Sequence, residues 1–377
     1  MSDYIPYELL PFELVIEILA RLPVVSLLRF KSVCKSWYSL IKSPSFVTKH
    51  LNHRKNKHIG IYSRDDQKER YFICRDDDQC GHEYSELEFP HKAPSADFMI
   101  AGSCNGLLCM WEDSSWDKSA IIVWNPSMRK LVTLPKPPLA RMCVLGFGAH
   151  PTTHEYKVVR IVYQTYPYQH ELQPYVELYT QGTGSWRGLG STFPLYCFID
   201  ITRKASQAFV SGAVNWIAED PRVSVGYRSI IVSFDMSTET FSEMILPPAL
   251  ADRERRSLSV TLFRESLAML CGQQRDKDDC CIWVMKEYGV PESWTKLFSF
   301  RLDWPVYPKR TLGFMKHNEV LVSTIDNRLL SYDIGTKALV DTGIRGHPSS
   351  FHFEPFVESL VLVENKNGIV DGQLNPL

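Results

Sequence analysis

The chain has 377 residues, of which 44% are hydrophobic, 12% aromatic and 23% charged. These proportions are typical of a soluble, well-packed protein and exclude extended disorder. No apolar run approaches the roughly 20 residues that span a bilayer, and the acidic start of the chain does not fit a signal peptide. A formal net charge of −1 gives no support to binding of nucleic acid or a membrane.

The charge is divided unevenly along the chain. Residues 1–58 hold nine Lys and Arg against four Asp and Glu, a net charge of +5, and the remaining residues hold 33 against 39, a net charge of −6. Such an asymmetry indicates two parts with different partners. The ten cysteines have no CxxC pair and no regular spacing, so we expect reduced thiols, as in the cytosol or nucleus, and no disulfide framework.

Residues 8–50 have a helical pattern, in which Leu14, Ile18 and Leu22 recur on one face. The pattern predicts three short helices that together carry more apolar surface than so small a unit can bury, so the surplus should face the rest of the chain or another protein. The helices are expected over residues 11–22, 24–33 and 34–43, with Pro23 and Pro44 ending the first and third.

These patterns divide the chain into three segments. We assign residues 1–48 to the helical domain, residues 49–58, KHLNHRKNKH, to a basic linker, and residues 59–377 to a domain of strands. For the linker, a solvated helix end is favoured over a segment that binds nucleic acid or directs nuclear import.

After residue 58, short runs rich in Val, Ile, Phe and Tyr alternate with turn clusters, and one hairpin pattern recurs. Its second strand begins near Leu131, Trp186, Phe241, Trp294 and Leu339, in steps of 55, 55, 53 and 45 residues. Several strands in a repeat of about 50 residues indicate a kelch-like β-propeller. The 319 residues available predict about six blades.

The N-terminal segment closely resembles the F-box of plant proteins. The resemblance covers Leu10–Phe46, LPFELVIEILARLPVVSLLRFKSVCKSWYSLIKSPSF. The remainder is similar to the F-box-associated domain of the same family in the segments SCNGLLC (103–109), VWNPSMRKLVTLP (123–135), GFGAHPTTHEYKVVRI (146–161), SGAVNWIA (211–218) and SFDMSTETF (233–241). The departures, His150 and Asn215, do not affect the fold assignment.

This resemblance implies a non-catalytic substrate receptor of an SCF-type (Skp–cullin–F-box) ubiquitin ligase, without a cofactor or metal, in the cytoplasm or nucleus. The helices would bind a small acidic Skp-type adaptor and, through it, a cullin-RING ligase, and the propeller would bind the protein to be ubiquitinated. A net charge of +5 would steer an acidic partner. The adaptor-facing positions carried over from the family are Leu10, Pro11, Ile18, Leu22, Pro23, Leu27, Val33, Cys34 and Trp37. Some of these, Ile18 among them, would equally suit the core of the domain.

The identity of the substrate does not follow from the sequence. Anchors on propeller loops are expected to be aromatic, and the aromatic residues in loop-like segments are Tyr166, Tyr168, Trp304 and Tyr307. Alternatively, these four aromatic side chains cover the edges of blades.

Three other functions stay open: a non-degradative F-box interaction protein, an S-locus-type receptor for S-ribonucleases, and a carbohydrate-binding or hydrolytic propeller. Chemical motifs give the last little support. His150 and His154 are spaced H-x3-H but stand in a turn, and Cys280 and Cys281 point to opposite faces of a strand. The glycines of GTGSWRGLG (182–190) lack the spacing and the following helix of a phosphate site.

Overall fold

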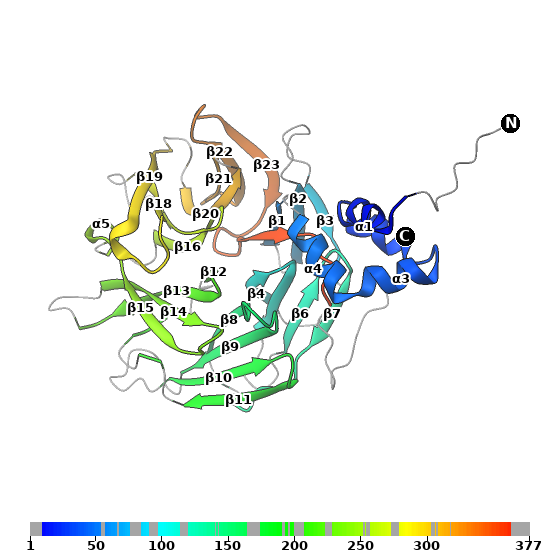
Figure 1. Ribbon diagram of the computed structural model, residues 1–377. Helices are drawn as coiled ribbons and strands as arrows, with labels where there is room; N and C mark the ends of the chain where they lie inside the picture. The colour runs from blue at the N-terminus through cyan, green and yellow to red at the C-terminus, as the bar shows by residue number, and fades with distance from the viewer. Residues whose placement is uncertain are drawn as a thin grey trace.

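A computed structural model of the chain shows a small helical domain attached to a β-propeller (Figure 1). The structure describes residues 10–53, 57–65, 68–75, 84–89, 97–113, 120–139, 141, 143–163, 174–190, 193–194, 197–199, 207–222, 228–251, 253, 257–272, 279–302, 306, 308–316 and 318–362.

The helical domain contains α1 (Phe12–Ala20), α2 (Val24–Phe30), α3 (Lys35–Lys42) and α4 (Pro44–His53). Prolines and a cysteine separate the first three helices, since Pro11, Pro23 and Cys34 occupy their N-cap positions. Each helix is too short to be stable alone. They share a core of buried side chains, which are Leu19, Ala20, Val24, Leu27, Ile41 and Phe46.

Pro44 ends α3 as predicted, but it also begins a fourth helix that we did not predict. The hydroxyl of Ser43 accepts a hydrogen bond from the backbone N–H of Phe46 at 3.3 Å, which caps the new helix. Pro44 then fills the first helical position, where its missing N–H is not needed. The basic segment predicted as a linker over 49–58 is correspondingly shorter, because α4 runs to His53 and the first strand begins at Lys57.

The propeller has six blades, each a four-stranded antiparallel sheet, which confirms the predicted fold and blade number. From the inner to the outer strand, blade 1 contains β24 (His352–Val357), β1 (Lys57–Asp65), β2 (Lys68–Arg75) and β3 (Tyr84–Leu87), and blade 2 contains β4 (Asp97–Cys104), β5 (Leu107–Asp113), β6 (Ile121–Asn125) and β7 (Lys130–Thr133). Blade 3 contains β8 (Cys143–Ala149), β9 (Tyr156–Val162), β10 (Tyr175–Thr180) and β11 (Ser185–Gly190), and blade 4 contains β12 (Gln207–Val210), β13 (Ala213–Asp220), β14 (Arg228–Asp235) and β15 (Phe241–Ile245).

Blade 5 contains β16 (Leu258–Phe263), β17 (Ser266–Cys271), β18 (Cys280–Met285) and β19 (Trp294–Phe300), and blade 6 contains β20 (Pro308–Lys316), β21 (Glu319–Thr324), β22 (Arg328–Asp333) and β23 (Leu339–Arg345). Two short helical turns complete the described elements: α5 (Pro248–Ala251) after blade 4, and the 3-10 turn η4 (Pro291–Ser293) before β19.

Blade 1 is built from both ends of the propeller. The last strand, β24, pairs antiparallel with β1 from Lys57 opposite Val357 to Tyr62 opposite His352. This pairing joins the end of the ring to its beginning, because the last strand of the propeller becomes the inner strand of the first blade.

The repeated hairpin found in the sequence is the outer half of a blade. Its five anchor residues stand at the first or second position of β7, β11, β15, β19 and β23. Blade 1 lies outside these five hairpins. Eight residues separate β2 from β3, as they separate β18 from β19 in blade 5, whereas the other four blades have four or five residues there.

A buried ion pair lies inside blade 3. Arg160 on β9 pairs with Glu177 on β10, and the two side chains are only 4% and 1% exposed. Arg160 Nη2 also donates to the carbonyl oxygen of Leu139 at 3.0 Å, which fixes the connection that enters the blade. Burial raises the pKa of Glu177 despite the opposing effect of Arg160, so desolvation outweighs the attraction between the two charges.

We expect the substitution Arg160→Ala to lower the free energy of unfolding by about 3–5 kcal/mol, because it leaves a buried carboxylate without its partner. Arg345→Ala is the matched control, since Arg345 pairs with Asp341 on the surface and exposed pairs contribute about 0–1 kcal/mol. Urea unfolding followed by circular dichroism measures both. Equal losses for the two variants would contradict the role assigned to the buried pair.

Candidate functional site

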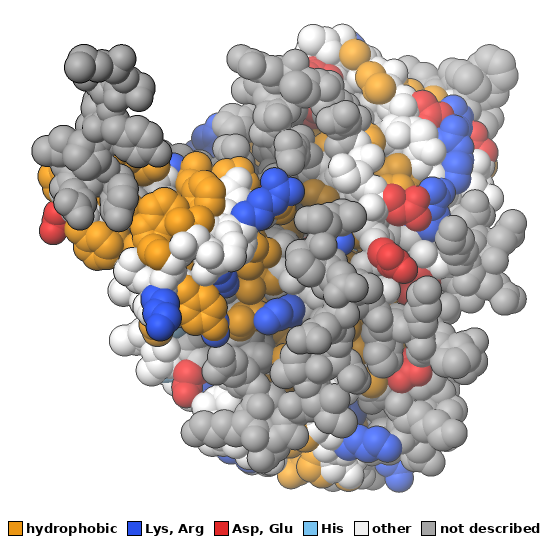
Figure 2. Space-filling view, turned by 90° about the vertical axis from the view of Figure 1, so that its right-hand side faces the viewer, with side chains coloured by type: hydrophobic (Ala, Val, Ile, Leu, Met, Phe, Trp, Pro, Cys, Tyr) orange, Lys and Arg blue, Asp and Glu red, His pale blue; other side chains and the backbone are white. Residues whose placement is uncertain are grey.

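The helical domain exposes an apolar face to solvent. In the described part of the chain, seven of the twelve exposed large hydrophobic side chains belong to this domain: Leu10, Phe12, Leu14, Ile18, Val25, Val33 and Tyr38. Orange side chains accordingly gather on the helices at the upper left of Figure 2. So dense an apolar patch on a small unit is typical of a protein-binding surface, and we call these seven residues the apolar face.

Several positions predicted to face the adaptor lie on the surface. Leu10, Ile18 and Val33 are 51%, 50% and 61% exposed, and Pro11, Pro23 and Cys34 are exposed too. Leu22 and Trp37 are half-buried and pack against the core of the domain.

Leu27 does not fit its predicted role, because its side chain is fully buried in the helical core. Within α2 the pair Val24 and Leu27, three residues apart, faces inward, and this turns Val25 outward. Leu27 therefore supports the helices from within and presents no surface to a partner.

The sequence interpretation missed four members of the apolar face: Phe12, Leu14, Val25 and Tyr38. The sequence did indicate that α1 exposes apolar side chains, because α1 reads FELVIEILA and is apolar on nearly every side. A helix of that kind has two faces to cover. Its own domain covers one, through Leu19 and Ala20, and leaves Leu14 and Ile18 exposed.

Basic side chains flank the apolar face. No Asp or Glu occurs between Glu17 and Asp65, so α2 and α3 carry positive charge alone, on Arg29, Lys35 and Lys42. These three side chains are exposed. An apolar patch with a positive rim is complementary to an acidic partner that has an apolar groove.

Cys34 stands at the edge of this surface as the N-cap of α3. Its sulfur lies 3.1 Å from the hydroxyl of Ser36 and accepts a hydrogen bond from the backbone N–H of Trp37 at 3.5 Å. The hydrogen bond with Ser36 and those from the backbone lower the pKa of the thiol. The other eight cysteines that the structure describes are buried.

The helices occupy the end of the propeller at which most of the tight turns lie. In an antiparallel blade, the turn between the first and second strands and the turn between the third and fourth lie at the same end. In blade 6 this is seen directly, because Ile334 N donates to Asn318 O at 2.7 Å across those two turns. Met128, in the β6–β7 turn of blade 2, belongs to the core of the helical domain.

The longer connections leave the strands at the opposite end. They join β5 to β6, β9 to β10, β13 to β14 and β17 to β18, as well as one blade to the next. The four aromatic residues predicted as substrate anchors, Tyr166, Tyr168, Trp304 and Tyr307, belong to the β9–β10 and β19–β20 connections. They lie outside the described residues, so their role as anchors stays a prediction.

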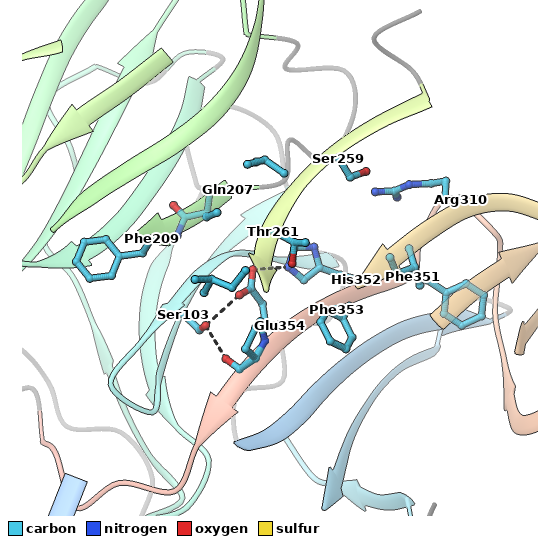
Figure 3. A pocket seen from close by; sticks show the side chains of 15 residues that line it. Ser103, Gln207, Phe209, Ser259, Thr261, Arg310, Phe351, His352, Phe353 and Glu354 are labelled. Carbon is cyan, nitrogen blue, oxygen red and sulfur yellow. Dashed lines mark hydrogen bonds and ion pairs between the residues drawn. The ribbon is translucent and has the colours of Figure 1, made fainter. Parts of the chain in front are cut away.

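The axis of the propeller contains a small polar cavity (Figure 3). Ser103 Oγ bonds to Glu354 Oε2 at 2.9 Å, and His352 Nε2 lies 3.0 Å from the other carboxylate oxygen. The cavity has a volume of about 20 Å³, which is room for about one water molecule. Glu354 is the one acid among the described residues that line it, whereas glycoside hydrolysis uses two carboxylates.

The histidines of the H-x3-H pattern shape a turn. His150 Nδ1 accepts hydrogen bonds from the backbone N–H groups of Thr152 and Thr153, both at 3.2 Å. Across the described residues there is no cluster of three or more His, Cys, Asp or Glu that could hold a metal ion. None of the helices in the described ranges is long and apolar enough to cross a membrane.

Comparison with known proteins assigns both parts of the chain. A model of the F-box domain matches residues 8–49, and a model of the F-box associated beta propeller domain matches residues 54–363. The chain belongs to this family of plant F-box proteins.

Its relatives match over most of their length. The F-box/kelch-repeat protein At3g23880 of Arabidopsis thaliana is 30% identical over 77% of this chain and 79% of its own. The F-box protein CPR1 of the same plant is 27% identical over 94% of this chain and 89% of its own. Among solved structures, YjhT superposes with a TM-score of 0.41 at 12% identity, over 74% of this chain and 92% of its own.

We expect Cys34 to be the first of the described cysteines to react with N-ethylmaleimide, because its thiol is exposed and its pKa is lowered. Cys109, fully buried with a raised pKa, should react at least about tenfold more slowly. Peptide mass spectrometry of timed samples measures both rates. Equal labelling of the two thiols would contradict the assigned environments.

Proposed function

We propose that the chain is the substrate-recognition subunit of an SCF-type ubiquitin ligase. The helical domain binds a Skp-type adaptor through the apolar face, and the propeller binds the protein to be ubiquitinated. The concentration of exposed apolar side chains on the helices that match the F-box carries this proposal.

The apolar face has the composition of an interface core. Its side chains are large, and two of them, Phe12 and Tyr38, are aromatic, as is common for residues that dominate binding energy. Full burial of a Leu or Ile side chain contributes about 1.5–3 kcal/mol. The positive rim on α2 and α3 adds long-range attraction, which speeds the encounter with an acidic adaptor and weakens as salt is added.

The mechanism is one of positioning, without covalent chemistry on this chain. The adaptor links the F-box to a cullin-RING ligase. The propeller holds the protein to be ubiquitinated, called here the client, so that a lysine of the client is close to the ubiquitin-loaded enzyme. Binding converts an encounter between two proteins into a reaction within one complex, which raises the effective concentration of the lysine. We place this activity in the cytoplasm or nucleus, where reduced cysteines are stable.

We place the client at the end of the propeller opposite the helices. The helices cover turns of blade 2 at their own end. The other end carries the 12 residues between β9 and β10 and the links from blade to blade, which give room for residues that vary between receptors. Tyr166, Tyr168, Trp304 and Tyr307 belong to those connections and remain our proposed anchors.

A hydrolytic or carbohydrate-binding role receives less support, because the axial cavity admits about one water molecule and contributes a single carboxylate. An S-locus role is a narrower form of the same proposal, with an S-ribonuclease as the client. A non-degradative interaction protein would bind the adaptor equally well. Client abundance with and without proteasome inhibition separates degradation from assembly alone, since only a degraded client accumulates on inhibition.

We expect Ile18→Asp to weaken binding of a purified Skp-type adaptor by about tenfold or more, because it places a charge on the apolar face. Ile325→Asp, at a 57% exposed position in the β21–β22 turn, is the matched control and should leave affinity unchanged. Isothermal titration calorimetry measures both. No adaptor binding by the unmodified chain would sink the proposed function, and equal binding by the Ile18 variant would sink the assigned surface.

A further inference from the structure

We propose that residues 358–362, which follow β24 and are called here the C-terminal strap, fix the F-box helices on blade 2. In this role Asn125, Met128 and Leu360 are positioning residues that hold the adaptor-binding face at a set orientation to the propeller.

One buried side chain holds the strap on the propeller. Asn125, at the end of β6, is 2% exposed. Its Nδ2 donates to the carbonyl oxygens of Ser359 and Val361 at 2.9 and 2.8 Å. Its Oδ1 accepts the backbone N–H of Met128 at 3.1 Å. The side-chain amide therefore donates to two carbonyl oxygens of the strap and also shapes the β6–β7 turn. A buried amide with all of these hydrogen bonds favours a single position of the strap on the turn.

A glycine makes room for the strap. Gly106, in the β4–β5 turn, has φ +79°, and a Cβ atom there would lie 2.3 Å from the carbonyl oxygen of Val357 and 2.4 Å from Cβ of Ser359. Any other residue at this position would therefore clash with the strap, in addition to the strain of a positive φ. The turn and the strap are in close contact along the backbone.

The opposite side of the strap is part of the helical core. Leu360 and Met128, 4% and 8% exposed, belong to the same buried cluster as Leu19 and Leu27, and Leu362 packs against it. Glu358 Oε2 also accepts the backbone N–H of Val24, at the start of α2, at 3.4 Å. The strap thus bonds to blade 2 on one side and fills the F-box core on the other.

Ring closure and F-box orientation depend on the same stretch of chain. The strap continues directly from β24, which closes the propeller on β1. The F-box precedes β1 and the strap follows β24. The chain therefore connects to the helices both where it enters the propeller and where it leaves it. If the proposed ligase function holds, this arrangement sets where a bound client stands relative to the adaptor.

The test measures the distance between the two domains in the full chain, without adaptor. Nitroxide labels are placed on the native exposed Cys34 and on Ile325→Cys, in a Cys80→Ser background, and pulsed electron resonance gives the distance distribution. The strap variant carries Asn125→Ala and Leu360→Ala. The control carries Asn215→Ala and Leu258→Ala, since Asn215 also donates Nδ2 to two carbonyls and Leu258 is 6% exposed, but both lie in other blades.

We expect the distribution to broaden by roughly twofold or more in the strap variant and to keep its width in the control, because only the strap variant releases the domain contact. Leu360→Met, which conserves the apolar volume, should restore the narrow distribution when Asn125 is intact. An unchanged width in the strap variant, or equal broadening in both, would overturn the proposal.

Two further measurements keep the test decisive. If the double variant does not fold, Leu360→Ala alone is examined by hydrogen exchange. We expect faster exchange of the backbone amides in α1 and α2. Unchanged exchange in these helices would overturn the proposal. Adaptor affinity is measured separately on the strap variant and should stay within about threefold of the parent, because the apolar face is untouched. If the chain without strap substitutions did not bind the adaptor, the proposed function would be wrong, but the measured distances between the two domains would still test the role of the strap.

Discussion

The pairing of β24 with β1 is the interaction on which the remaining structure depends. A blade can bury its faces only against its neighbours, so a ring of blades is stable only if the first and last meet. Here the first and last strands of the propeller pair in one sheet, from Lys57 opposite Val357 to Tyr62 opposite His352. The hydroxyl of Ser103, on the next inner strand, then bonds to Glu354 and to the carbonyl oxygen of Pro355, which fastens the closing strand to blade 2 as well.

Closure also determines where the helical domain can stand. Because β1 begins and β24 ends at one end of the propeller, the F-box that precedes β1 and the strap that follows β24 arrive at the same place. The tight turns of blade 2 at that end, with Gly106 and Met128, receive both. The helical domain can therefore complete its core with Leu360 and Met128, which a unit with so few residues could not fill alone.

The parts of this structure that follow local rules were predictable from the sequence. The outer hairpins recur near Trp186, Phe241 and Trp294 because each needs an aromatic or apolar anchor after a tight turn, and this repeat gives the propeller. Long-range pairing leaves no such signal, so the closure by β24 and the strap were not predicted. Leu27 was misplaced for a related reason: periodicity shows that a helix has an apolar face, but neighbouring elements decide which face is covered.

The surplus apolar surface of the helices falls into two shares, one buried within the chain and one exposed. One share, through Leu19, Val24 and Leu27, is covered within the chain by α4, Met128 and the strap. The other share, around Leu14, Ile18 and Val33, stays exposed on the opposite side. A helical unit of this size that binds on two sides transmits the orientation of one neighbour to the other, because packed side chains resist relative rotation. In the proposed complex, the short F-box would therefore be a rigid joint between adaptor and propeller, stiffened by the residues that the propeller contributes to its core.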